Sequence, residues 1–241
     1  MPENLEKYSR QVEEFLAVAH QLARDKYVTS HGGNLAWRLE SDLILITPTQ
    51  VYKGDLRAED LVFIDNQGKV IEGSRRPTGE TPMYLTFLSQ RPDIQTVIHC
   101  HPPSACAIAI SKAKNWLMRP LYPETTTEIG PVPLVPYAQP LTDELAKNFE
   151  PFLPKYNCFI MENHGLVAMS RGSIQWTMGL IDLLEMTARS ILLAASVGEI
   201  KELSRQDVID LDHVMKKRNL PLFGLPGVNR SLEALYFPQA E

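Results

Sequence analysis

The stretch VIHCHPPSACAIA, residues 97–109, restricts the fold more than any other part of the sequence. An apolar run ends on two histidines separated by one residue, and two prolines and a series of small residues follow. Alternate residues of a strand point to the same face, so His99 and His101 can converge on one ion. The stretch therefore predicts a buried strand that delivers two imidazoles to a site and is followed at once by a helix over residues 104–110.

The rest of the chain alternates between helical and strand patterns. We predict helices over residues 5–27, 81–88 and 173–195, a short helix from about 142, and strands in GGNLAWRL, DLILIT and CFIMENHGLVAMS. A hairpin turn is expected at residues 65–68, and the proline-rich segment 120–133 reads as a long functional loop. We expect one α/β domain over residues 1–241, with an apolar tail from about 197 that packs on its own or a neighbouring subunit.

Charge and cysteine content exclude several classes of protein. The formal net charge is −5, with lysines and arginines scattered along the sequence, which argues against a nucleic-acid or anionic-membrane surface. The three cysteines show no C-x-x-C spacing, and a reducing compartment is the simpler interpretation. No signal peptide is visible, and the longest apolar region is interrupted by Asp182, Glu185 and Arg189. We expect a cytoplasmic protein.

A third histidine, His164, lies between an apolar strand and a glycine that permits a tight turn. Three imidazoles leave positions free for a carboxylate, water or substrate, and zinc suits such ligands. The alternative is that these are ordinary polar residues at strand ends, because an isolated H-x-H motif is weak. His20 and His213 have no partner in the pattern and read as structural, whereas His31 lies beside GGN, where a ligand can approach the backbone.

Five motifs in one order carry more information than any of them alone: TSHGGNLAWRL, LILITPT, RRPTGETPMY, VIHCHPPSACA and MENHGLVAM. Together they resemble the class II aldolase/epimerase (adducin head) family over roughly residues 10–195, and in pattern they are most similar to L-fuculose-1-phosphate aldolase. The resemblance implies a three-layer α/β/α fold with a central, mainly antiparallel sheet. It also implies a homotetramer with fourfold symmetry and active sites between subunits.

The resemblance implies one zinc ion per subunit, or another divalent transition metal, held by His99, His101, His164 and Glu80. Glu80 is expected to act as the acid/base as well. Epimerases of the family tend to have aspartate at this point, so glutamate favours the aldolase branch.

A tyrosine from the adjacent subunit protonates the aldehyde oxygen in the family aldolase. Tyr122 falls near that position, although the loop differs in length, and Glu124 is a rival donor or base. Tyr122 can also be read as a residue that merely packs among prolines. A second family tyrosine lies near the C-terminus, where Tyr236 is the candidate.

Members that act on phosphorylated sugars bind the phosphate through Gly-Asn, Thr-Gly and Ser-Ser pairs. The corresponding residues here are Gly33, Asn34, Thr49, Thr78 and Gly79. Gln50 departs from the pattern by adding bulk where the family favours glycine. Either the substrate carries another group, such as a carboxylate, or the phosphate is bound differently, with help from Lys53, Arg75 or Arg76, which are by default surface charges.

The function we predict is that of a zinc-dependent class II aldolase in carbohydrate metabolism, which cleaves or forms a C–C bond of a short ketose through a metal-stabilised enediolate. The substrate is expected to be a sugar phosphate such as L-fuculose 1-phosphate. A 4-epimerase or a dehydratase would use the same metal site. A silent assembly module like the adducin head would have lost metal ligands, and a metallohydrolase has only the metal triad in its favour.

Overall fold

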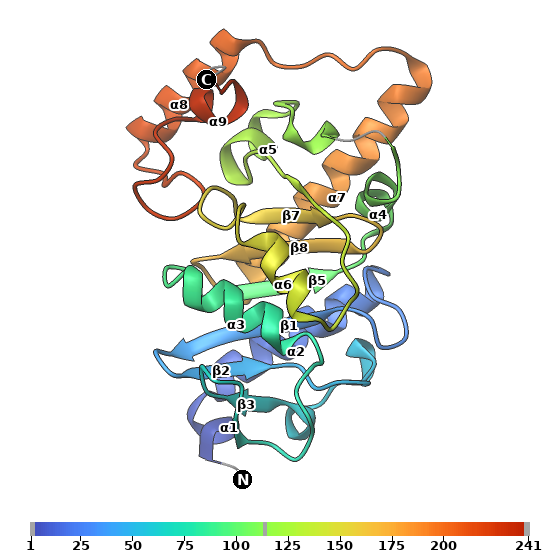
Figure 1. Ribbon diagram of the computed structural model, residues 1–241, viewed down its shortest axis with the longest axis vertical. Helices are drawn as coiled ribbons and strands as arrows, with labels where there is room; N and C mark the ends of the chain where they lie inside the picture. The colour runs from blue at the N-terminus through green and yellow to red at the C-terminus, as the bar shows by residue number, and fades with distance from the viewer. Residues whose placement is uncertain (1–2, 113–114, 239–241) are drawn as a thin grey trace.

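A single sheet of eight strands forms the centre of the computed structural model, which describes residues 3–112 and 115–238 (Figure 1). Its strands, in chain order, are β1 (Asn34–Glu40), β2 (Leu43–Ile46), β3 (Val62–Ile64), β4 (Val70–Glu72), β5 (Thr96–Cys100), β6 (Leu134–Val135), β7 (Cys158–Met161) and β8 (Gly165–Ser170). Their order across the sheet is β4-β3-β2-β1-β5-β8-β7-β6. Every neighbouring pair is antiparallel except β6 and β7, so the predicted mainly antiparallel sheet is confirmed.

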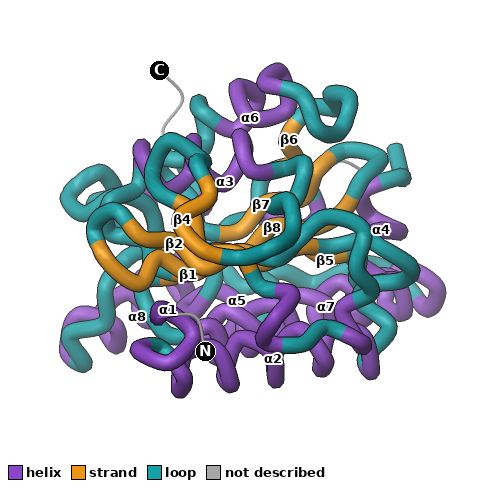
Figure 2. Tube along the Cα trace, turned by 90° about the horizontal axis from the view of Figure 1, so that it is seen from below, coloured by secondary structure: helices purple, strands orange, loops and turns teal. Residues whose placement is uncertain are grey.

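Helices cover both faces of this sheet, as Figure 2 shows. On one face lie α2 (Ser9–Arg24), α4 (Pro103–Ala109) and α7 (Ile174–Val197), which share one apolar cluster with the sheet. On the other face lie α3 (Thr81–Gln90) and α6 (Asp143–Phe149), which share a second cluster. The three-layer α/β/α prediction is therefore confirmed. Among the described residues, no helix is both long and apolar enough to cross a bilayer.

The N-terminal helix differs from the single helix predicted over residues 5–27. The segment forms α1 (Glu3–Lys7) and α2, which are separated at Tyr8. Helix α2 ends at Arg24, and Lys26 then adopts a φ of 63° that no α-helix accommodates. The apolar spacing continues beyond the helix because Tyr27 packs against the same core cluster without being helical.

Two other predicted segments can be compared directly with the structure. The hairpin at residues 65–68 joins β3 to β4, and Gly68 has the positive φ, 79°, that its turn requires. The proline-rich segment is more ordered than predicted, because Pro123 begins the short helix α5 (Pro123–Glu128) at a position where a missing N–H costs nothing.

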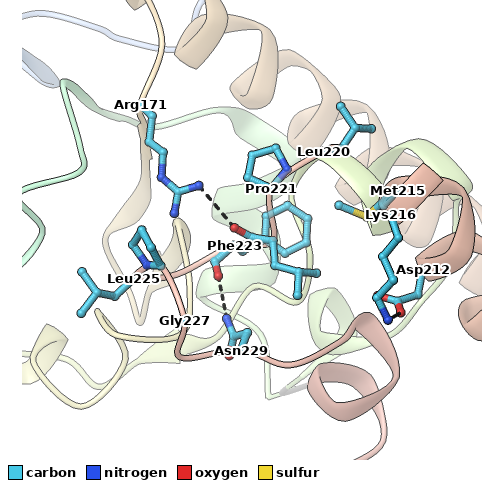
Figure 3. A pocket seen from close by; sticks show the side chains of 12 residues that line it. Arg171, Asp212, Met215, Lys216, Leu220, Pro221, Phe223, Leu225, Gly227 and Asn229 are labelled. Carbon is cyan, nitrogen blue, oxygen red and sulfur yellow. Dashed lines mark hydrogen bonds and ion pairs between the residues drawn. The ribbon is translucent and has the colours of Figure 1, made fainter. Parts of the chain in front are cut away.

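The C-terminal tail packs on this same chain. It contains α8 (Arg205–Lys217), capped by the Ser204 side chain, and α9 (Leu232–Tyr236). The two helices share a small apolar cluster with Phe223. Arg171, which follows β8, donates to the Gly224 carbonyl. Figure 3 shows that it also donates to the Leu222 carbonyl, and that Asn229 of the tail donates to the Phe223 carbonyl. Arg171, Phe223 and Asn229 are among the residues that line a pocket of about 340 Å³, and no histidine lines it.

Candidate metal centre

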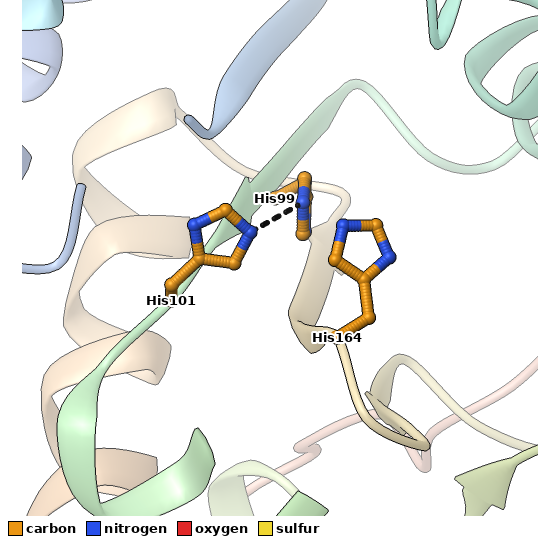
Figure 4. A group of neighbouring side chains, drawn as sticks. All are labelled: His99, His101 and His164. Carbon is orange, nitrogen blue, oxygen red and sulfur yellow. Dashed lines mark hydrogen bonds between the residues drawn. The ribbon is translucent and has the colours of Figure 1, made fainter. Parts of the chain in front are cut away.

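Three histidines from two separate segments converge beside the centre of the sheet (Figure 4). His99 lies on β5, where it is paired with Asn34 of β1 and with Val167 of β8. His101 follows the strand, and His164 lies in the turn between β7 and β8. Because β5 and β8 are antiparallel neighbours, the end of β5 and the turn before β8 lie next to each other.

The ligand atoms of the three histidines all lie within 4.8 Å of one another. The Nε2 atoms of His99 and His101 are 3.1 Å apart. Glu80, at the start of α3, brings its carboxylate to 3.8 Å from Nε2 of both His99 and His164. The Asn34 amide donates to the same carboxylate at 2.7 Å and fixes its orientation. The four predicted ligands therefore surround one point.

Burial keeps these imidazoles neutral. It lowers the pKa of His99 to about 3, and the neighbouring His164 adds to the effect. Burial and the nearby His99 lower the pKa of His101 to about 3 as well. The pKa of His164 is also lowered by burial, against the opposing charge of Glu80. A neutral imidazole is the form that binds a metal ion, so the three histidines can bind one without first releasing protons.

Neighbouring groups hold the rings in place. The Nδ1–H of His99 donates to the Leu166 carbonyl at 2.9 Å, which leaves Nε2 as a lone pair directed at the centre. The backbone N–H of His101 donates to the Tyr27 carbonyl. Glu185 of α7 accepts hydrogen bonds from the N–H groups of Ser104 and Ala105, and so fixes the start of α4 immediately after His101. The sequence offers no signal for this contact across 80 residues.

Two glycines allow the chain to pack closely around the histidines. A Cβ at Gly165 would lie 2.6 Å from Cδ2 of His101 and 2.7 Å from the Cys100 carbonyl oxygen. A Cβ at Gly33, whose φ is 68°, would collide with Val28 and approach the His99 carbonyl to 3.0 Å. The glycines of the GGN and NHG motifs therefore allow close packing around the histidines.

All five residues predicted to bind phosphate line one pocket of about 180 Å³ together with the histidines and Glu80. They are Gly33, Asn34, Thr49, Thr78 and Gly79. Gln50 lines it too, with a φ of 59°, which explains why glycine is favoured at this position. The pocket also contains His31, as its place beside GGN suggested, and Lys53.

Fewer backbone N–H groups of this pocket are free to bind an anion than the sequence suggested. The N–H of Thr49 already donates to the Arg76 carbonyl, and that of Thr78 donates to the Thr47 carbonyl. The Thr78 hydroxyl in turn accepts from the N–H of Glu80 at 3.3 Å. These two threonines can offer an anion their hydroxyls but not their backbone N–H groups.

The structure does not bring the predicted proton donors into this pocket. Tyr122, which precedes α5, is 36% exposed and lines another pocket with Ile200 and Lys201. Glu124 is exposed on α5, and Tyr236 packs with the apolar cluster of the tail. Within one chain, none of the three lines the pocket that contains the histidines.

The donor set fits a metal ion. Three imidazole nitrogens and one carboxylate converge without another cation between them, and Nδ1 of His164 is buried without a hydrogen-bond partner among the described residues. Two histidines lie elsewhere, as predicted. Nε2 of His20 is hydrogen-bonded to the Leu56 carbonyl, and His213 is exposed on α8. His99, His101 and His164 can hold a divalent ion, and the Glu80 carboxylate lies beside two of them.

Comparisons with known proteins agree with this geometry. Residues 13–192 match the family model described as Class II Aldolase and Adducin N-terminal domain. A 3-oxo-tetronate 4-phosphate decarboxylase of Pectobacterium atrosepticum is 27% identical over 187 residues, which cover 77% of this chain and 84% of the relative. An L-fuculose phosphate aldolase of Methanococcus vannielii is 31% identical over 158 residues, which cover 66% of this chain and 83% of the relative.

A solved structure of a related protein has the same fold. The crystal structure of YgbL from Klebsiella pneumoniae, described as a putative aldolase/epimerase/decarboxylase, superposes with a TM-score of 0.77 at 29% identity. The alignment covers 84% of this chain and 98% of that one. The family model alone spans well over half of the sequence and includes Glu80 and all three histidines. The chain belongs to the class II aldolase and adducin family.

Proposed function

We propose that this metal-dependent lyase is a zinc enzyme that cleaves and forms a C–C bond of a short ketose phosphate. The observation that carries the proposal is the convergence of His99, His101, His164 and Glu80 in one pocket with the residues expected to bind phosphate. A relative named L-fuculose phosphate aldolase supports the choice of reaction.

The three histidines would hold the ion and leave positions open for substrate. When bound, the ion supplies positive charge that stabilises the negative charge developing on the ketone oxygen. Because the imidazoles are neutral ligands, they do not cancel that charge. Zinc suits imidazole donors better than magnesium or calcium does, which is why we propose it.

Glu80 is the group that moves a proton. In the bond-forming direction its carboxylate takes a proton from the hydroxymethyl carbon of the ketone, and in the cleavage direction it returns that proton. Asn34 holds the carboxylate at 2.7 Å and keeps it next to His99 and His164. From this position Glu80 would be able both to contribute to holding the ion and to act as a base toward bound substrate.

The aldehyde oxygen needs a separate donor, and we propose that Tyr122 of a neighbouring subunit provides it. Within its own chain Tyr122 lies in a different pocket, with part of its ring exposed. A homotetramer with active sites between subunits would bring this surface to the metal pocket of the next chain. Mixing Glu80→Gln with Tyr122→Phe subunits tests this. Each variant alone would be inactive, and mixed oligomers would regain activity only if the two residues act across an interface.

Decarboxylation is the second candidate. The decarboxylase of Pectobacterium atrosepticum gives it direct support, and the pocket of one chain contains no tyrosine among its described lining residues. When a 3-oxo acid loses its carboxylate, the C–C bond electrons flow toward the ketone oxygen and carbon dioxide leaves. No aldehyde oxygen has to be protonated. The same metal and Glu80 would serve, with Glu80 taking a proton from solvent and delivering it to the carbon that lost carbon dioxide.

The deciding experiment is a panel of ketose 1-phosphates, their unphosphorylated analogues and 3-oxo acid phosphates, incubated with the zinc-loaded protein. Aldehyde release identifies the aldolase, and carbon dioxide release identifies the decarboxylase. Glu80→Gln should reduce turnover about 10²- to 10⁴-fold, the usual contribution of an acid/base group. The exposed Glu144→Gln on α6 is the matched control. Failure of the wild type to release either product would refute both lyase reactions and direct the assays to epimerised or dehydrated sugars.

A further inference from the structure

We propose that Lys53 is the specificity-determining residue that binds the oxyanion of the substrate. The inference rests on the proposed function in one respect, namely that the pocket with the histidines is where the substrate binds. Neither the family pattern nor the sequence identifies Lys53 as more than one of three candidate cations.

Lys53 begins the 3₁₀ turn Lys53–Asp55 and is only 1% exposed. Its Nζ donates to the Val51 carbonyl at 3.0 Å and is 3.5 Å from the His31 carbonyl. Both acceptors are neutral. Among the described residues no carboxylate lies within ion-pair distance of this ammonium group.

A buried, unpaired ammonium group is costly. Buried charges in proteins are normally paired, because hydrogen bonds to neutral acceptors alone do not offset the free-energy cost of removing a charge from water. Burial lowers the pKa of Lys53 to about 8, although the charge of Glu80 opposes the shift. An anion that enters the pocket would supply the missing partner and relieve this cost. Proteins commonly retain such destabilising groups where function needs them.

Of the three candidate cations, Lys53 is the one placed to bind an anion in this pocket. The backbone N–H groups of Thr49 and Thr78 are already used, so the expected backbone cradle is incomplete. Arg75 pairs with Asp60 at 2.5 Å and lies outside the pocket lining, as does the side chain of Arg76. The buried charge of Lys53 therefore takes the place of the backbone N–H donors that Thr49 and Thr78 cannot offer.

A second buried group also awaits a ligand. Oδ1 of Asn34 has no hydrogen-bond partner among the described residues, although Asn34 is only 7% exposed and lines the same pocket. Its Nδ2 is already committed to Glu80. An incoming molecule with an oxyanion for Lys53 and a hydroxyl for Asn34 would satisfy both groups, and a phosphorylated or carboxylated hydroxy ketone has this composition.

The test is a calorimetric titration of zinc-loaded wild type, Lys53→Met and Arg75→Met with inorganic phosphate and, separately, with glycolate. Methionine keeps the unbranched shape and most of the length of the side chain without its charge. A charge-assisted hydrogen bond contributes about 1.5–3 kcal/mol, so Lys53→Met should weaken binding about 10- to 100-fold. Arg75→Met should bind as wild type does. Zinc content is measured in each sample, because phosphate can also bind the metal.

Each result has a distinct meaning. Loss of phosphate affinity on Lys53→Met supports the proposal with a phosphorylated substrate, and a selective loss of glycolate affinity supports it with a carboxylated one. Unchanged affinity for both anions, with zinc retained, would overturn it. An increase in the urea midpoint of Lys53→Met would agree with a functional group maintained at a cost, whereas a structural lysine would lower the midpoint when removed. Anion binding requires no turnover, so this test stands even if neither lyase reaction is found.

Discussion

Metal-free protein should lose stability steeply between pH 7 and pH 5, because the histidines of the candidate metal centre resist protonation in the folded state. The pKa of His99 falls from 6.5 to about 3 on burial. The unfolded chain therefore binds protons in this pH window that the folded chain does not, and the free energy of unfolding decreases as the pH falls. Above pH 7 both states are neutral and the effect is absent.

The size of the loss follows from the linkage relation. Each pH unit below 6.5 costs about 1.4 kcal/mol for a group that stays neutral when folded, so His99 contributes about 2 kcal/mol at pH 5. His101 has a similar pKa of about 3 but is partly exposed, and we count roughly half as much for it. The expected total is about 3 kcal/mol, a large part of the 5–15 kcal/mol that is typical of a domain.

Urea unfolding at a series of pH values measures this directly. Wild type is compared with His99→Gln/His101→Gln, which removes the two imidazoles counted above, and with His213→Gln on the surface of α8. The double variant should lose about 3 kcal/mol less than wild type over the same interval, and His213→Gln should follow wild type. If wild type and the double variant lose the same amount, burial does not hold these imidazoles neutral, and the account of the site given above is wrong.

Three further predictions concern stability and metal binding. Gly165→Ala should lower zinc affinity in a chelator competition and cost about 1–3 kcal/mol on urea unfolding, because its Cβ would press against the His101 ring. Arg91→Met should cost about 3–5 kcal/mol by the same assay, since Arg91 is fully buried and paired with Asp93. Lys53→Met should raise the free energy of unfolding by about 1–3 kcal/mol in phosphate-free buffer, as expected from the lowered pKa of a buried lysine.

The metal site could be predicted because short-range geometry determines most of it. The H-x-H spacing places His99, on β5, and His101, just beyond the strand, on one side, and the glycine after His164 indicates a tight turn. The assignment of Glu80 came from family resemblance, since no local rule connects a residue before α3 with histidines of β5. The structure supplies that connection by pairing Asn34 with His99 across β1 and β5, and Asn34 then holds Glu80.

Other features depend on contacts that a sequence does not display. Lysine is expected at the surface, and only the packing of the turn after Gln50 shows that Lys53 is buried in the pocket. The apolar spacing of the N-terminal helix continues past its end, because Tyr27 is partly buried by tertiary packing and not by helical periodicity. Tyr122 is a similar case, since its distance in sequence from the histidines says nothing about which subunit's pocket it reaches.

The two candidate reactions differ in what they require beyond the metal. Both push electrons toward the same ketone oxygen, and in our proposal both use Glu80 as the group that exchanges a proton with carbon. Only aldol chemistry also needs a donor for the aldehyde oxygen, and a single chain does not place its candidate tyrosine in the pocket. The two reactions therefore differ in whether they require a residue from a neighbouring subunit. An active site completed by Tyr122 from a neighbour favours the aldolase, whereas one that works with Glu80 and Lys53 alone favours loss of a carboxylate.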